Sequence, residues 1–162
     1  MHLIEERLGA IQRPFTIRRA TTEDAAGLAE LMRRTFVEAF AAQNRPEDIE
    51  AYAKESYGSE QQLREIESGE MTTLVCEHEA TPIAFAQLRR QVSPAVDDPQ
   101  SIELFRFYVD QRWHGCGVAQ ELLREVSRTA EALGARSVWL GVWERNPRAI
   151  AFTRPRNEVH AK

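Results

Sequence analysis

The residues of this chain best suited to chemistry stand together in one short run, His114-Gly115-Cys116-Gly117-Val118-Ala119-Gln120. The run joins a strand-like segment, Ile102 to Val109, to a segment of helical periodicity that begins at Gly117. Small residues at such a junction let backbone N–H groups approach an anion, and the positive end of the helix dipole attracts it. The spacing therefore predicts a pyrophosphate-binding loop.

Two common nucleotide-binding motifs do not fit this loop. The dinucleotide fingerprint requires a third glycine where this chain has Gln120, and a P-loop requires a lysine that does not follow Gly117. A glycine-rich turn between a strand and a helix also serves as a simple tight connection without a ligand. The loop by itself leaves both interpretations open.

Overall charge and apolar patterning narrow the range of partners. The 162-residue chain has a formal net charge of −4 and a pI near 5.6, which argues against phosphate-backbone binding, since that needs a basic surface. The longest apolar runs, such as Ile83-Ala84-Phe85-Ala86, are too short to span a bilayer or to form a signal-peptide core. We therefore expect a single-domain cytoplasmic protein that binds neither nucleic acid nor membrane.

Cysteine and histidine are too sparse to predict a disulfide framework or a metal site. The chain has 2 cysteines, Cys76 and Cys116, and 4 histidines without paired ligand spacing. We expect two free thiols and no metal. Cys116 lies in the glycine-rich loop, but no nearby His/Asp signature marks it as a nucleophile.

The first half of the sequence predicts one strand followed by several helices. Alternation predicts a strand at 15–18, and Thr21-Thr22-Glu23-Asp24 is typical of a helix start with acids in its first turn. Pro46 suits the first position of a second helix. Ser59-Glu60-Gln61-Gln62 matches a capping box for a third helix.

The second half predicts the sheet that carries the loop. Strand-like runs at 72–76 and 83–88, separated by the turn-like Ala80-Thr81-Pro82, indicate an antiparallel hairpin. The strand before the loop, the helix from Gly117 to Gly134 and a strand at 137–143 form a β-α-β unit. Its strands at Ile102 and Val138 should be parallel and joined by a right-handed crossover, so we expect an α/β fold with a mixed, twisted sheet flanked by helices.

Two segments resemble motifs of the GNAT family of acetyl-CoA-dependent N-acetyltransferases. The run Ile102 to Asp110 with the following loop resembles the family's motif A, whose loop reads Gln/Arg-x-x-Gly-x-Gly/Ala, with His114 in the Gln/Arg position. Asn146-Pro147-Arg148-Ala149-Ile150-Ala151-Phe152 resembles the segment Asn-x-x-Ala-x-x-Phe-Tyr, which packs against the pantetheine arm. The resemblance covers about residues 15–153, and a narrower similarity points to bacterial spermidine/spermine acetyltransferases.

The resemblance implies which residues hold acetyl-CoA. Backbone groups of Phe107, Tyr108 and Val109 would pair with the pantetheine and orient the thioester carbonyl as an oxyanion hole does. The loop from His114 to Gln120 would hold the pyrophosphate, and Asn146 would contact the pantetheine arm, although Asn146 also suits a plain helix N-cap.

Acetyl transfer to an amine also requires a base, because an alkylammonium with a pKa near 10.4 must lose a proton before it attacks. Glu103 is our candidate for this base. The alternative is that Glu103 is only a solvated charge at the end of a strand.

The C-terminal residues depart from the family pattern. The family has a tyrosine that protonates the leaving thiolate where this chain has Thr153, whose hydroxyl is a far weaker acid. The residues after Thr153 contain a proline and do not rebuild the last strand of the family's sheet. We therefore divide the chain into an extension at 1–14, an acetyltransferase domain at 15–153 and an atypical tail at 154–162.

These observations favour an N-acetyltransferase in which the primary amine of a polyamine or other small amine attacks acetyl-CoA directly. Acidic helical residues, including Glu38, Glu47, Asp48, Glu50 and Glu55, would attract a polycation, although such charges usually belong to a solvated face. One alternative is an acyl-CoA-binding module without turnover, and another is an interaction domain without CoA affinity. A further alternative is a homodimer in which a partner covers the open edge of the sheet.

Overall fold

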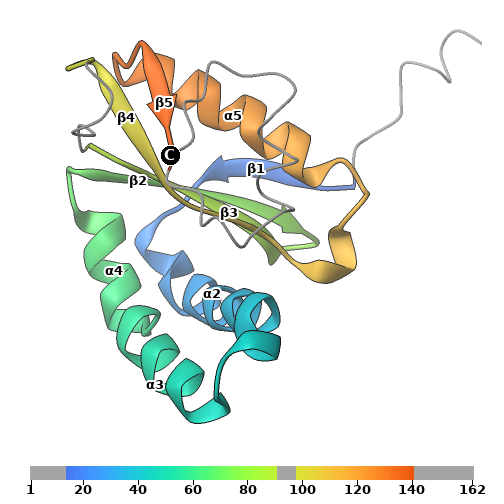
Figure 1. Ribbon diagram of the computed structural model, residues 1–162. Coiled ribbons are helices and arrows are strands. Elements are labelled where there is room, and N and C mark those ends of the chain that lie inside the picture. The colour runs from blue at the N-terminus through green and yellow to red at the C-terminus, as the bar shows by residue number, and fades with distance from the viewer. Residues whose placement is uncertain (1–13, 91–97, 141–162) are drawn as a thin grey trace, which may run out of the picture.

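A five-stranded mixed sheet forms the centre of the protein, in the computed structural model that describes residues 14–90 and 98–140 (Figure 1). The strand order is β1-β2-β3-β4-β5, antiparallel from β1 to β4 and parallel between β4 and β5. Ile102 lies opposite Val138 in the parallel pair, which confirms the predicted β-α-β unit. The strands are β1 (Thr16–Arg19), β2 (Met71–His78), β3 (Thr81–Arg89), β4 (Ser101–Val109) and β5 (Ser137–Trp139).

Helices cover both faces of this sheet (Figure 1). α5 (Val118–Ala132) lies on one face, and α2 (Ala25–Phe40), α3 (Pro46–Ser56) and α4 (Ser59–Glu67) lie on the other. Three short 3-10 helices complete the described elements: η1 (Thr22–Asp24), η2 (Ala41–Gln43) and η3 (Gln111–Trp113). The predicted helix start at Thr21 is confirmed, since the Thr21 N–H donates to Asp24 Oδ2 over 2.7 Å.

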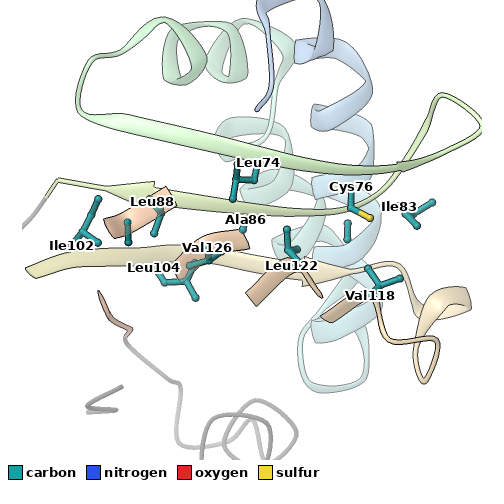
Figure 2. Close-up of a cluster of buried hydrophobic side chains, with 12 residues drawn as sticks. Leu74, Cys76, Ile83, Ala86, Leu88, Ile102, Leu104, Val118, Leu122 and Val126 are labelled. Carbon is teal, nitrogen blue, oxygen red and sulfur yellow. The ribbon is translucent and has the colours of Figure 1, made fainter. Parts of the chain in front are cut away.

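Side-chain alternation along the strands divides the interior into two apolar clusters. Figure 2 shows the cluster beneath α5, in which Leu122 and Val126 of the helix meet the sheet. On the opposite face, Val75 and Phe85 pack against α2 and α3. Apolar residues must therefore recur about every 2 residues along the strands and about every 3.6 residues along the helices, and the sequence has both patterns.

β4 contains a bulge that changes its alternation. Leu104 pairs with Leu88 and Arg106 pairs with Gln87, so Phe105 is an extra residue on β4. Before the bulge the residue that faces α5 is Leu104, and after it Phe107 does so. The bulge therefore turns Arg106 toward the face covered by α4, a position that the sequence pattern alone does not predict.

Two local predictions were wrong. The hairpin turns at Glu79 and Ala80, whose φ angles are 47° and 65°, so the predicted turn residues Thr81 and Pro82 belong to β3. A two-residue turn with positive φ at both positions matches the twist of the strands better than a longer loop.

The predicted capping box at Ser59 is absent. Gly58 is the N-cap of α4 and makes no side-chain cap. The Gln62 side chain is instead fully buried, where its Oε1 accepts a hydrogen bond from Gln87 Nε2 over 3.3 Å. Burial against the sheet thus outweighs the local cap.

The predicted α/β fold is confirmed. The strand at 137–143 is confirmed for Ser137–Trp139, and residues 141–143, the tail at 154–162 and nearly all of the N-terminal extension lie outside the described residues. Within residues 14–90 and 98–140, no helix has both the length and the apolar character needed to cross a membrane.

Candidate functional site

The glycine-rich loop joins β4 to α5 with two residues in the left-handed conformation. Gly115 has φ +80° and Gly117 has φ +84°, and Gly117 is the N-cap of α5. A Cβ added at either glycine would meet no atom within 4 Å, so glycine is favoured there by backbone conformation and not by crowding. The N–H groups of Val118, Ala119 and Gln120 are in the first turn of α5, where an α-helix offers them no intrahelical partner. Such a turn suits an anion.

His114 ties the loop back to the end of β4. Its Nε2 lies 3.0 Å from the carbonyl oxygen of Val109, to which it donates when that nitrogen carries the proton. No role for this side chain was predicted from the sequence, since the family contacts at its position were expected from the backbone. The Cys116 thiol is exposed, and its Sγ lies 3.9 Å from the His114 carbonyl oxygen.

Backbone direction separates the three predicted pantetheine contacts. The Asp110 N–H donates to the Ile83 carbonyl of β3 over 2.8 Å, so by strand alternation the backbone groups of Tyr108 also face β3, opposite Phe85. Those of Phe107 and Val109 face the other way, toward the side of β4 on which β5 lies. The geometry therefore favours Phe107 and Val109 over Tyr108 as backbone partners of a bound ligand.

β5 accompanies β4 over only part of its length in the described residues. Its pairs are with Ser101, Ile102 and Glu103, whereas β4 continues to Val109 beside the loop. The pairing and the loop thus lie at opposite ends of β4. A ligand whose anion occupied the loop would reach β4 beyond these pairs.

Glu103 lies on the face of the sheet covered by α4, and it is buried. Arg89 Nη2 and Nε lie 2.6 and 2.7 Å from the same carboxylate oxygen, Oε2. The Arg89 guanidinium also stacks over the Phe105 ring at 3.9 Å. The alternative of a solvated strand-end charge is therefore wrong, because Glu103 is only 8% exposed. Its role as a base stays a prediction.

A buried polar network lies next to Glu103 on the same face. Arg106 Nη1 donates to Glu65 Oε2 over 2.9 Å and to Gln87 Oε1 over 2.6 Å. The Glu65 and Arg106 side chains are 8% and 12% exposed. Sequence reasoning missed this pair, since α4 and β4 are far apart in the chain and only the bulge turns Arg106 toward Glu65.

Aromatic rings gather where α2 and α3 meet. The Phe36 ring stacks on Tyr52 with centroids 5.0 Å apart and lies 5.5 Å from Tyr57 and 4.9 Å from Phe40. Tyr52 is 53% exposed, so one edge of this aromatic cluster faces solvent. Burial raises the pKa of Tyr57 to about 12 and also raises that of Tyr108. Both phenols therefore stay protonated at neutral pH.

A family model described as "Acetyltransferase (GNAT) family" matches residues 27–156, which run from within α2 through the loop and α5 to beyond β5. The chain belongs to the GNAT acetyltransferase family. It is accordingly an acetyl-CoA-dependent N-acetyltransferase, as the resemblance of two of its segments to the family's motifs predicted. Asn146 and Thr153, the other two predicted site residues, lie outside the described residues.

Comparisons with individual proteins agree with this assignment. The chain is 31% identical over 129 residues to an uncharacterised N-acetyltransferase of Mycobacterium tuberculosis, covering 80% of this chain and 79% of that protein. Among solved structures, the PaiA N-acetyltransferase of Thermoplasma acidophilum in complex with coenzyme A has a TM-score of 0.75 at 24% identity, covering 85% of each chain. An aminoglycoside acetyltransferase from an uncultured soil metagenomic sample, in complex with sisomicin, has a TM-score of 0.65 at 17% identity, covering 91% of this chain and 93% of that one. These structural likenesses support the fold.

Proposed function

We propose that this GNAT enzyme transfers the acetyl group of acetyl-CoA directly to the primary amine of a small molecule. The observation that carries the proposal is the loop geometry. Two left-handed glycines open the N-terminus of α5 beside the end of β4, where the Val109 backbone faces away from β3. A pyrophosphate in the loop and a pantetheine along β4 would use both features.

Within this proposal, the chain's residues divide the chemical tasks. Backbone groups of Phe107 and Val109 orient the thioester carbonyl and stabilise the negative charge that develops on its oxygen. Glu103 accepts the proton of the acceptor ammonium directly or through water, using the oxygen that Arg89 does not contact. The C–N bond forms as the C–S bond breaks, and the thiolate then takes up a proton.

The acceptor side is proposed to lie along α2 and α3, because that face combines aromatic rings with carboxylates. The exposed Tyr52 ring belongs to an element that also carries Glu47, Asp48, Glu50 and Glu55 against a single Lys54. Aromatic faces and carboxylates both attract alkylammonium groups. A polyamine-like acceptor fits this chemistry, as does another multiply charged amine such as an aminoglycoside, which one structural relative binds as sisomicin.

The proposal is tested by calorimetric titration with acetyl-CoA, followed by measurement of thiol release over a set of amines. We expect micromolar affinity, a standard free energy of binding of about −8 kcal/mol, and thiol release that depends on the amine. Binding without thiol release for any amine would favour the non-catalytic acyl-CoA-binding module. A lack of binding would contradict the assignment of the loop itself.

Thr153 provides a separate test of how the thiolate is protonated. By the family resemblance, Thr153→Tyr should restore a proton donor beside the sulfur and raise turnover by about ten- to a hundred-fold, with little change in acetyl-CoA affinity. Steady-state thiol release on one amine measures the first effect, and calorimetry measures the second. An unchanged turnover in a folded, cofactor-binding variant would mean either that water already protonates the thiolate or that position 153 lies away from the site.

A further inference from the structure

Asp110 is a buried carboxylate at the point where β4 ends and the loop begins. The residue is 1% exposed, and its Oδ1 accepts the backbone N–H of Arg112 over 3.0 Å. The Arg112 guanidinium contacts both carboxylate oxygens, with Nε 3.3 Å from Oδ1 and Nη2 3.0 Å from Oδ2. The Asp110 backbone is fixed as well, since its carbonyl accepts the N–H of Trp113 over 2.8 Å. Asp110 therefore determines the path of η3 into the loop.

The second arginine that contacts the Asp110 carboxylate is Arg34, which lies on helix α2. Arg34 Nη2 lies 2.7 Å from Asp110 Oδ2, and the two residues are 76 positions apart in the chain. The Arg34 side chain is 37% exposed, yet its Nε is buried and has no hydrogen-bond partner among the described residues. The unpaired, buried Nε opposes this conformation of the Arg34 side chain. The contact of Nη2 with Asp110 therefore favours the conformation.

The consequence is a direct link between two parts of the site. α2 carries Phe36 and Phe40 of the aromatic cluster, and Arg34 of the same helix reaches the residue that fixes η3. The loop glycines adopt left-handed conformations that glycine reaches without strain, and a Cβ added at either would meet no described atom within 4 Å. The residues before the glycines are held by the contact of His114 with Val109 and by the Asp110 contacts, and Val118 after them is buried in the cluster beneath α5.

We propose that Arg34 and Asp110 are positioning residues, which hold the pyrophosphate loop in its binding geometry from the acceptor-side helix. This inference rests on the proposed function, because it assumes that the loop binds the pyrophosphate of acetyl-CoA. Neither residue needs to touch the cofactor. The hydrogen bonds donated by Arg112 hold the pKa of the Asp110 carboxyl below its usual range. Asp110 therefore stays ionised, as a partner of Arg34 must.

The test compares two acyl donors that differ in the nucleotide part of the molecule, which contains the pyrophosphate. Acetyl-CoA carries it and acetyl-pantetheine does not, so a displaced loop should weaken only the first. We expect Arg34→Met to raise the acetyl-CoA dissociation constant by about tenfold, the factor that corresponds to 1.4 kcal/mol. The KM for acetyl-pantetheine should stay unchanged. Arg34→Lys, which keeps the charge, should recover part of the affinity.

A matched control removes a charge from the same helix without touching Asp110. Arg33 is exposed and neighbours Arg34, so Arg33→Met should leave both acyl donors unaffected. Asp110→Asn should weaken acetyl-CoA binding at least as much as Arg34→Met, and the double variant should lose no more than Asp110→Asn alone, because both act through one contact. If Asp110→Asn does not fold, the comparison of Arg34→Met with Arg34→Lys still decides the point.

The outcomes separate this inference from the proposed function. Equal losses for acetyl-CoA and acetyl-pantetheine in Arg34→Met would show a general stabilising contact and overturn the inference. An unchanged acetyl-CoA affinity in Arg34→Met would overturn it as well. If the unsubstituted chain itself did not bind acetyl-CoA, the proposed function would fail and the inference with it.

Discussion

Gly117→Ala gives the sharpest test of the loop, because Gly117 combines a demanding backbone conformation with a place beside the expected anion. Its φ is +84°, and an added Cβ would meet nothing within 4 Å in the protein. The substitution therefore introduces no clash with the protein itself. Any effect on acetyl-CoA must come from altered backbone direction or from the methyl group occupying ligand space.

The expected loss of stability follows from the conformation. An alanine in the left-handed region costs about 1–2 kcal/mol. The lower entropy of the unfolded alanine chain offsets about 0.4–1 kcal/mol of this cost. The net loss is about 1 kcal/mol, which corresponds to a decrease in Tm of about 2–4 °C for a chain of this size.

Gly134 supplies the matched control at the other end of α5. Its φ is +86°, and an added Cβ there also meets nothing within 4 Å. The two glycines are about 25 Å apart along the helix, from a rise of about 1.5 Å per residue. Gly134→Ala should therefore lower Tm as much as Gly117→Ala does.

The assay is calorimetric titration of both variants with acetyl-CoA, beside thermal unfolding. We expect Gly117→Ala to weaken binding by at least about tenfold, an energy of about 1.4 kcal/mol, and Gly134→Ala to bind as the unsubstituted chain does. Equal affinity in the two variants would refute the assignment of the loop as the pyrophosphate site. A loss of affinity in both would indicate that general destabilisation explains the effect.

Three further predictions concern charged groups. Glu103→Gln should lower turnover much more than acetyl-CoA affinity. The loss of turnover should shrink toward pH 10, because the amine needs less help to lose its proton there. An equal loss of thiol release at pH 7 and pH 10 would indicate a structural role. Glu65→Gln leaves the Arg106 charge without its buried carboxylate, so urea unfolding should show a loss of about 3 kcal/mol, and no measurable loss would contradict the pairing seen here. The hydrogen bond from Arg18 lowers the Asp24 pKa from 3.8 to about 2, so the ionised carboxylate stabilises the fold above pH 3.8 and this stabilisation disappears as pH falls through 2. Because Arg18 is 40% exposed, Asp24→Asn should lower the free energy of unfolding by only about 1 kcal/mol at pH 7 and by almost nothing near pH 1.5. Urea unfolding at both pH values measures this difference, and an equal loss at both would refute the linkage.

Local signals in the sequence were enough to predict most of the elements and the loop. The glycines at 115, 117 and 134 mark left-handed positions that other residues avoid, and they delimit α5 correctly. Hydrophobic periodicity likewise predicted β4 and the parallel partner at Val138. These features depend on the conformational preferences of a few neighbouring residues, so the sequence alone determines them.

Several local predictions were overturned where tertiary packing competes with them. Ser59 and Gln62 have the letters of a capping box, but the sheet offers Gln62 a buried hydrogen bond to Gln87. At the hairpin, a tight turn at Glu79 and Ala80 displaced the predicted one, so that Pro82 became part of β3.

Only the tertiary structure determined which charges meet. The bulge at Phe105 turns Arg106 toward Glu65 of α4, and the packing of α2 brings Arg34 to Asp110. The sequence determined the loop and the strand before it, because glycine conformation and apolar periodicity are local properties. It did not determine the partners of its buried charges, because a carboxylate can pair with any arginine that the fold brings within reach, and that choice depends on how distant helices pack across the sheet.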